Sequence, residues 1–145
     1  MKIGHAHLKV RDLNRSLAFY TERLGLRVTE RIGSNYAFLT GTEMHHEIAL
    51  QNIGSSAPDA PAHGVGLYHV AFEVKSKPDF TEAYQKLTAA GVEVSAVDHR
   101  ISWALYFSDP DGNGLEIYVD TRHEPDGALL WDGVNLPLPA QKTDE

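Results

Sequence analysis

The chain has 145 residues, of which 42% are hydrophobic and 23% are charged, so it suits one compact domain with a real core. It contains no cysteine, which excludes disulfides, a thiolate nucleophile and a sulfur-rich metal site. The net charge of -7 argues against a nucleic-acid partner, because phosphate binding needs a basic face. Neither a long apolar run nor a signal-peptide pattern is present, so we expect no membrane span and a cytoplasmic location.

The first part of the chain has the pattern of a βαβββ module. Asp12 or Asn14 is expected to cap its helix, and Gly25 stands where a left-handed residue ends one. The strands are recognised by alternating or apolar stretches bounded by Gly, Ser and Asn. The expected elements are a strand at 5–10, a helix ending near residue 24, and strands at 26–31, 36–40 and 45–50.

After a linker at 52–66, rich in Ser, Pro, Gly and Ala, the same pattern starts again. Ser76 or a neighbour is expected to cap the second helix, and Gly91 to end it. The expected strands are 68–74, 92–97, 104–108 and 114–120. The chain therefore divides into a module at 1–51, the linker, a module at 67–120 and a tail at 121–145, of which residues 141–145 are expected to be disordered.

Two histidines occupy matched places in this duplication, since His5 opens the first strand of one module and His69 that of the other. Glu116 alternates with apolar neighbours on the last strand and so points away from the core. We predict an α+β fold in which two tandem βαβββ modules form one cupped, barrel-like mixed sheet around a metal site. Without cysteine, the ligands available to that metal are imidazole, carboxylate and water.

Three stretches, HAHLKVRDLNRSLAFYTERLGL, YHVAFEV and ALYFSDPDGNGLEIY, resemble the vicinal oxygen chelate superfamily. That superfamily includes glyoxalase I, the fosfomycin and bleomycin resistance proteins and the extradiol ring-cleavage dioxygenases. The resemblance implies that His5, rather than His7, is the first metal ligand and that His69 and Glu116 complete the set. Two histidines and one carboxylate leave open positions on the metal, which is typical of non-haem Fe(II) sites, and Mn(II) accepts the same ligands.

The stretch MHHEIAL is similar to the extradiol dioxygenase strand that bears the acid-base histidine, which implies this role for His46. Tyr106 matches the tyrosine that hydrogen-bonds substrate or bound oxygen, where we expect it to donate, and His99 matches a histidine near the pocket mouth. The resemblance thus implies cleavage of a catechol-type ring, with a small aromatic diol and O2 as substrates, by a homodimer. Three aromatic residues are candidates to line the slot for the ring: Phe72, Trp103 and Phe107.

Other functions stay open because of the alternation on the strand expected at 45–50. In a regular strand, His46 lies on the same face as the apolar Ile48 and Leu50, which is the helix side, and Glu47 faces the metal. Only a bulge or a local break would turn His46 toward the metal instead. In the regular strand Glu47 becomes a fourth ligand, as in glyoxalase I, an isomerase that acts on a glutathione hemithioacetal. A third reading is a non-catalytic drug-binding resistance protein, since some members of the superfamily sequester drugs.

Overall fold

The computed structural model describes residues 1–139 and confirms the α+β class and the two βαβββ modules. The expected disorder at 141–145 lies outside the described residues. The elements of the first module are β1 (Ala6–Val10), α1 (Leu13–Glu22), β2 (Arg27–Ile32), β3 (Tyr36–Thr40) and β4 (Ile48–Asn52). The second module and tail contain β5 (Val70–Val74), α2 (Lys77–Ala89), β6 (Ser95–Asp98), β7 (Ser102–Ser108), β8 (Gly114–Asp120) and β9 (Leu136–Pro137).

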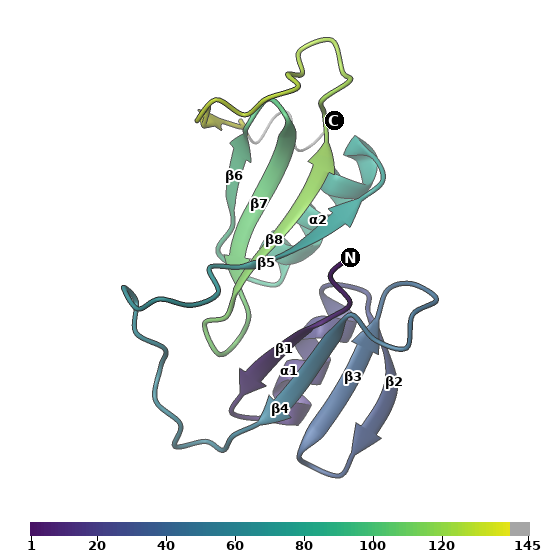
Figure 1. Cartoon of the computed structure of the whole chain (residues 1–145), viewed down its shortest axis with the longest axis vertical. Helices are drawn as coiled ribbons and strands as arrows, with labels where there is room; N and C mark the ends of the chain where they lie inside the picture. The colour runs from purple at the N-terminus through teal and green to yellow at the C-terminus, as the bar shows by residue number, and fades with distance from the viewer. Residues whose placement is uncertain (140–145) are drawn as a thin grey trace. The chain divides into compact units, whose positions relative to one another are not determined.

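Each module forms a sheet of its own, with one helix lying on one face (Figure 1). The strand order is β1-β4-β3-β2 in the first module and β5-β8-β7-β6-β9 in the second. The pairs β1–β4 and β5–β8 are parallel, and all other neighbouring strands are antiparallel. The duplicated sequence therefore gives two sheets with matching topology, and the face opposite each helix is where polar side chains from several strands gather.

The core of each module lies between its sheet and its helix. In the first module Tyr20 of α1 is fully buried with apolar residues of three strands, namely Leu8, Val10, Ala37, Leu39, Ile48 and Leu50. In the second module Phe80 and Leu87 of α2 are buried with Leu105, Leu115, Ile117 and Val119. Each such side chain contributes roughly 1.5–3 kcal/mol when fully buried. This packing fixes which strand positions face away from the helix.

Both helices begin at a capping residue that the sequence predicts. The Asp12 carboxylate accepts a hydrogen bond from the backbone N–H of Arg15 at 3.0 Å, so Asp12 rather than Asn14 is the cap of α1. The Ser76 hydroxyl accepts from the N–H of Asp79 at 3.3 Å and caps α2. Neither helix in the described part of the chain is long and apolar enough to cross a membrane.

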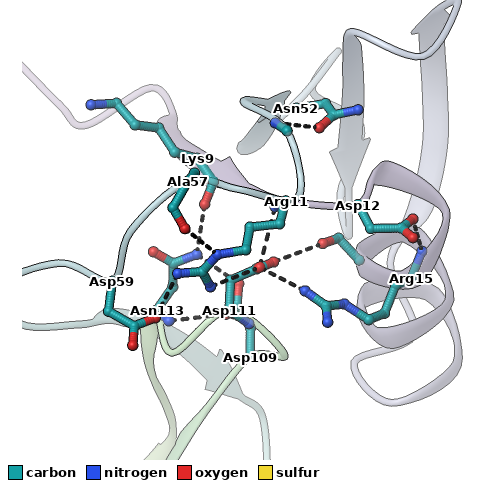
Figure 2. Close-up of polar contacts among 12 residues, drawn as sticks. Lys9, Arg11, Asp12, Arg15, Asn52, Ala57, Asp59, Asp109, Asp111 and Asn113 are labelled. Atoms are coloured by element: carbon teal, nitrogen blue, oxygen red, sulfur yellow. Dashed lines mark hydrogen bonds and ion pairs between the residues drawn. The ribbon is translucent and has the colours of Figure 1, made fainter.

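The chain divides into two compact units, and the segment Asp109–Asn113 between β7 and β8 groups with Met1–Gly66 rather than with its sequence neighbours. Figure 2 shows the contacts of Asp111 and Asn113 with Arg11, Arg15 and Lys9. The buried Asp109 carboxylate accepts hydrogen bonds from the Tyr20 hydroxyl at 2.8 Å and from the Asn113 side-chain amide and the backbone N–H groups of Asp111 and Asn113, all at 2.9 Å. A buried carboxylate with four donors is fully satisfied.

Asp111 supplies the second anchor of this segment. Its carboxylate, only 4% exposed, accepts from the guanidinium of Arg15 at 2.7 Å, from the guanidinium and backbone N–H of Arg11, and from the Ser16 hydroxyl (Figure 2). Arg11 also pairs with Asp59 at 2.5 Å. The turn-rich sequence between β7 and β8 is thus an ion-paired part of the first unit.

β6 begins at Ser95 rather than at residue 92, and two larger differences from the sequence-based expectation involve β4 and the tail. The strand expected at 45–50 begins only at Ile48, because residues 41–45 form a series of bends and Glu47 forms another. The tail, for which the sequence shows no period, adds the short strand β9 to the edge of the second sheet beside β6, and Leu138 behind it is 7% exposed. Both differences concern the candidate functional site.

Candidate functional site

In the first module, His5 and His46 lie against each other on the face opposite α1. Their ring centroids are 4.5 Å apart, and the His46 ring also lies 5.0 Å from that of Phe38 on β3. The neighbours of Phe38 on the strand, Ala37 and Leu39, are fully buried on the helix side, so Phe38 faces the other way. His46 therefore shares the face of His5.

The conflict over the orientation of His46 disappears because His46 precedes β4. Strand alternation does not extend to it, and the expectation that the strand starts at His45 is wrong. The physical reason is Glu47, whose carboxylate accepts from the Thr40 hydroxyl at 2.8 Å, from the Thr42 hydroxyl and from the Gly41 N–H at 3.4 Å. These bonds close residues 40–47 into a tight loop.

The two candidate residues in this loop have different electrostatic surroundings. Partial burial alone raises the pKa of Glu47, but the hydrogen bonds from Thr42, Thr40 and Gly41 outweigh it and hold the pKa below its usual value. Partial burial, and then the neighbouring rings of His5 and His45, lower the pKa of His46. Glu47 is thus an ionised carboxylate engaged by three donors, and His46 is a neutral imidazole at neutral pH.

In the second module, His69 and Glu116 form a close pair. The His69 Nε2 lies 2.8 Å from the Glu116 Oε2, and Glu116 is only 8% exposed. Ala71 is the register partner of Glu116, and His69 stands two residues earlier, so alternation puts both side chains on the same face. Gly114 allows this approach, since a Cβ there would lie 2.2 Å from the carbonyl oxygen of Tyr68.

The His69–Glu116 pair fits a divalent cation. It offers one imidazole nitrogen and one carboxylate oxygen, which are ligand types that Fe(II) and Mn(II) accept. The His69 Nδ1 is also buried without a hydrogen-bond partner, the single such side-chain atom within residues 1–139, so the imidazole is not satisfied by protein groups alone. Within the same residues, neither unit by itself gathers three His, Asp or Glu side chains into a metal-holding group.

Tyr106 and His99 lie next to the His69–Glu116 pair, so that four polar side chains follow one another in the second module. Tyr106 is directly opposite Glu116 on the adjacent strand, and its ring centroid is 5.6 Å from that of His69. Burial and the Glu116 carboxylate raise the pKa of Tyr106 to about 12, which keeps the phenol protonated. The Tyr106 hydroxyl lies 2.7 Å from the Nε2 of His99, whose Nδ1 is 3.1 Å from the carbonyl oxygen of Val134.

The candidate residues thus fall into two groups. His5 and His46 belong to the first unit, and the second unit contains His69, Tyr106, Glu116 and His99. The remaining histidine of the loop, His45, is exposed and lies 3.2 Å from the Glu30 carboxylate.

The aromatic residues expected to line a slot are on the other face. Trp103 packs on Phe80 of α2 with ring centroids 6.0 Å apart, and it alternates with Tyr106 on β7. Phe107 adjoins Tyr106, and Phe72 pairs with Ile117 of the core, so these two also face the helix. That expectation was wrong, because alternation along β5 and β7 places all three aromatic side chains on the helix face of the sheet.

The sequence analysis did not identify Tyr118 or Val134 as parts of the site. Tyr118 shares the face of Glu116 by simple alternation, and this signal was available. Burial and the opposite Glu73 raise the pKa of Tyr118. Trp131 and Val134 belong to the tail, which the sequence predicts to pack either across the pocket mouth or on a partner chain, and the structure pairs this tail with the sheet through β9.

The duplicated topology agrees with comparisons to known proteins. The chain belongs to the Glyoxalase/Bleomycin resistance protein/Dioxygenase superfamily, whose family model matches residues 2–117. This confirms the resemblance found in the three sequence stretches.

Among its relatives, Catechol-2,3-dioxygenase of Bacillus subtilis is 38% identical over 119 residues, which cover 81% of this chain and 41% of that protein. The chain therefore spans less than half the length of this relative. Glutathione transferase FosA of Serratia marcescens is 31% identical over 117 residues, covering 81% and 79%. A crystal structure of a glyoxylase/bleomycin resistance protein/dioxygenase domain from Frankia has a TM-score of 0.69 and 28% identity over 83% of this chain and 98% of that one.

Proposed function

We propose that the chain is a metal-dependent extradiol dioxygenase that cleaves a catechol-type ring with O2. The observation that carries the proposal is the His69–Glu116 pair at 2.8 Å, with Tyr106 opposite Glu116 and hydrogen-bonded to His99. The similarity to a protein named catechol-2,3-dioxygenase supports this reaction over others in the superfamily.

The proposed metal is Fe(II), with Mn(II) as the alternative. His69 and Glu116 are the ligands from the second module, and His5 enters the set because it precedes β1 as His69 precedes β5. Fe(II), when bound, would supply coordination sites for the diol and dioxygen together and a path for electrons from the diol to dioxygen.

The side chains of the protein have distinct tasks in this proposal. His46 takes the proton of a catechol hydroxyl, because its lowered pKa leaves a neutral imidazole at neutral pH. Tyr106 makes a hydrogen bond to an oxygen of the bound diol, and His99 holds the Tyr106 hydroxyl in place. Tyr118, on the same strand face as Glu116, adds an apolar ring beside the diol.

The four-ligand, glyoxalase I-like alternative has less support. The Glu47 carboxylate already accepts from Thr40, Thr42 and Gly41. The strand registers also make Ala49, which follows Ile48 on β4, the counterpart of Glu116, which follows Leu115 on β8. A methyl group therefore stands where a second carboxylate ligand would be needed.

A second candidate is metal-dependent thiol transfer. The specific observation is the 31% identity to Glutathione transferase FosA, which this chain matches over 79% of that protein's length. The His69–Glu116 pair suits this chemistry equally well as a metal site, so substrate tests must separate the two. A homodimer and a cytoplasmic location are further proposals. Light scattering of the purified chain tests the first of these.

Oxygen uptake tests the proposed function. Protein reconstituted anaerobically with Fe(II) is mixed with a panel of catechols, and we expect oxygen consumption with a coloured ring-opened product. His5→Ala and Glu116→Gln should abolish both, while the surface variant His123→Ala should retain them. Glutathione consumption with fosfomycin, without oxygen uptake, would replace the proposal by the second candidate. Tight drug binding with no turnover and no metal dependence would favour a resistance protein.

A further inference from the structure

The tail of the chain is attached to the second sheet beside the loop that carries His99. β9 pairs antiparallel with β6, with Val97 opposite Pro137 and Asp98 opposite Leu136. The backbone N–H of Leu138 donates to the carbonyl of Ala96 at 3.3 Å. The tail is therefore fixed next to the end of β6. This strand ends at Asp98, the residue before His99.

A tight turn precedes β9. Asp132 and Gly133 have φ angles of 51° and 74°, and the N–H of Val134 donates to the carbonyl of Trp131 at 3.0 Å. Two central residues with positive φ define a type I′ turn, which Asp-Gly favours. The indole N–H of Trp131 in turn donates to the carbonyl of Val134 at 2.7 Å. The Val134 carbonyl is thus held in one direction by bonds at both ends of the turn.

That carbonyl decides the proton position on His99. A carbonyl oxygen only accepts, so the His99 Nδ1, 3.1 Å away, must carry the hydrogen. In the neutral imidazole the Nε2 is then an acceptor, 2.7 Å from the Tyr106 oxygen. The Glu116 carboxylate is a second acceptor beside the Tyr106 hydroxyl. Two lone pairs repel at 2.7 Å unless a hydrogen lies between them, so the hydroxyl hydrogen points to the Nε2. The Trp131 ring stands edge-on to His99 at 6.0 Å and limits its rotation.

We propose that the turn from Trp131 to Val134 is a positioning element of the active site, which sets the His99 tautomer and thereby makes Tyr106 a hydrogen-bond acceptor toward the ligand. The Tyr106 hydrogen is used on His99, so only the oxygen lone pairs remain for a bound molecule. The site then selects ligands that present a free hydroxyl, and the direction of this bond is opposite to the one expected from sequence. The ligand part of this inference rests on the proposed function; the tautomer part does not.

The tautomer is measured by nitrogen-15 NMR of labelled histidines in the full chain without metal, at about pH 8, where an ordinary imidazole is neutral. His99→Gln identifies the His99 signals. We expect the Nδ1–H tautomer in the wild type and also in Tyr106→Phe, because the carbonyl and not the phenol sets it. An Nε2–H tautomer in the wild type, or a change of tautomer in Tyr106→Phe, would overturn the inference.

Two variants break the turn in different ways. Gly133→Val places a β-branched residue at positive φ, and Trp131→Phe keeps a ring but removes the indole N–H. Both should mix the two His99 tautomers, whereas the control Trp103→Phe, on the opposite face, should not. Unchanged tautomers in both turn variants would remove the positioning role, and circular dichroism of each variant checks that the fold is retained.

Ligand binding tests the second half of the inference. Metal-loaded protein should bind catechol about twofold more weakly in Trp131→Phe if the two tautomers become equally populated, because only one of them leaves Tyr106 as an acceptor, and should bind the di-O-methylated catechol, which has no hydroxyl to donate, with little change. Equal loss for both ligands would contradict the acceptor role of Tyr106. If no catechol binds at all, the proposed function fails, while the NMR result still decides whether the turn sets the tautomer.

Discussion

The two modules share one scaffold but carry different chemistry on the face opposite the helix. His5 and His69 precede equivalent strands, yet Ala49 of the first module stands in the register position of Glu116 in the second. The first face gathers imidazole and phenyl rings, while the second carries a connected carboxylate, imidazole and phenol row. Duplication thus conserves where side chains are placed, and each half has its own functional groups.

The sharpest test of this difference replaces one carboxylate of each module by an amide and compares the metal affinities of the two variants. Glu116→Gln should weaken Fe(II) or Mn(II) binding by more than about 100-fold, because even residues behind the ligands cost 10–100-fold when removed. Glu47→Gln should leave metal affinity nearly unchanged, since Glu47 is bonded within its own loop. Isothermal titration with each metal measures both. Comparable losses in the two variants would show that the first module also supplies a carboxylate ligand.

A second test uses the strand starts. Glu47 of the first module has its register counterpart in Gly114, where a Cβ would lie 2.2 Å from the Tyr68 carbonyl oxygen. Gly114→Ala should therefore destabilise the chain by about 3 kcal/mol and disturb His69, because backbone must move. Gly66→Ala, with nothing within 4 Å of the added Cβ, is the matched control. Urea unfolding measures both, and equal stability would mean that the segment before β5 adapts freely.

The helices allow a third test. α1 buries the Tyr20 phenol, whereas α2 buries Phe80, and both are 0% exposed. Burial and the Asp109 carboxylate raise the pKa of Tyr20. Tyr20→Phe removes one of four donors to that carboxylate and should cost about 1.5 kcal/mol in the free energy of unfolding. Tyr36→Phe, which loses only a 3.4 Å bond from Gln51, should cost less. A larger cost at position 36 would contradict the role of Asp109.

The smallest expected effect is a pH dependence of the first module. The folded pKa of Glu47 lies below its ordinary 4.5, so its contribution to stability is present above that pH and is lost as pH falls through the folded value. The stability difference between wild type and Glu47→Gln should therefore shrink on acidification from about pH 6 to about pH 3. A constant difference across this range would mean that the Thr40 and Thr42 bonds do not favour the ionised form.

Much of the fold was predictable because it depends on local sequence patterns. Alternation, the caps Asp12 and Ser76 and the repeat of the two histidines depend on residues close in sequence. The start of β4 was not predictable, since the Glu47 loop depends on side-chain bonds that compete with strand extension. The direction of the Tyr106 hydrogen depends on Val134, 28 positions later, and no pattern in the tail encodes that contact.

The grouping of Asp109–Asn113 with the first unit has a consequence for dissecting the molecule. The backbone passes from one unit to the other at 66/67, at 108/109 and again at 113/114. A single protease cut in the linker would therefore leave two covalent links intact, and the halves would stay tethered. A gene fragment that ends at Gly66 would encode a Tyr20 without its carboxylate acceptor, so the two halves are no longer separable building blocks.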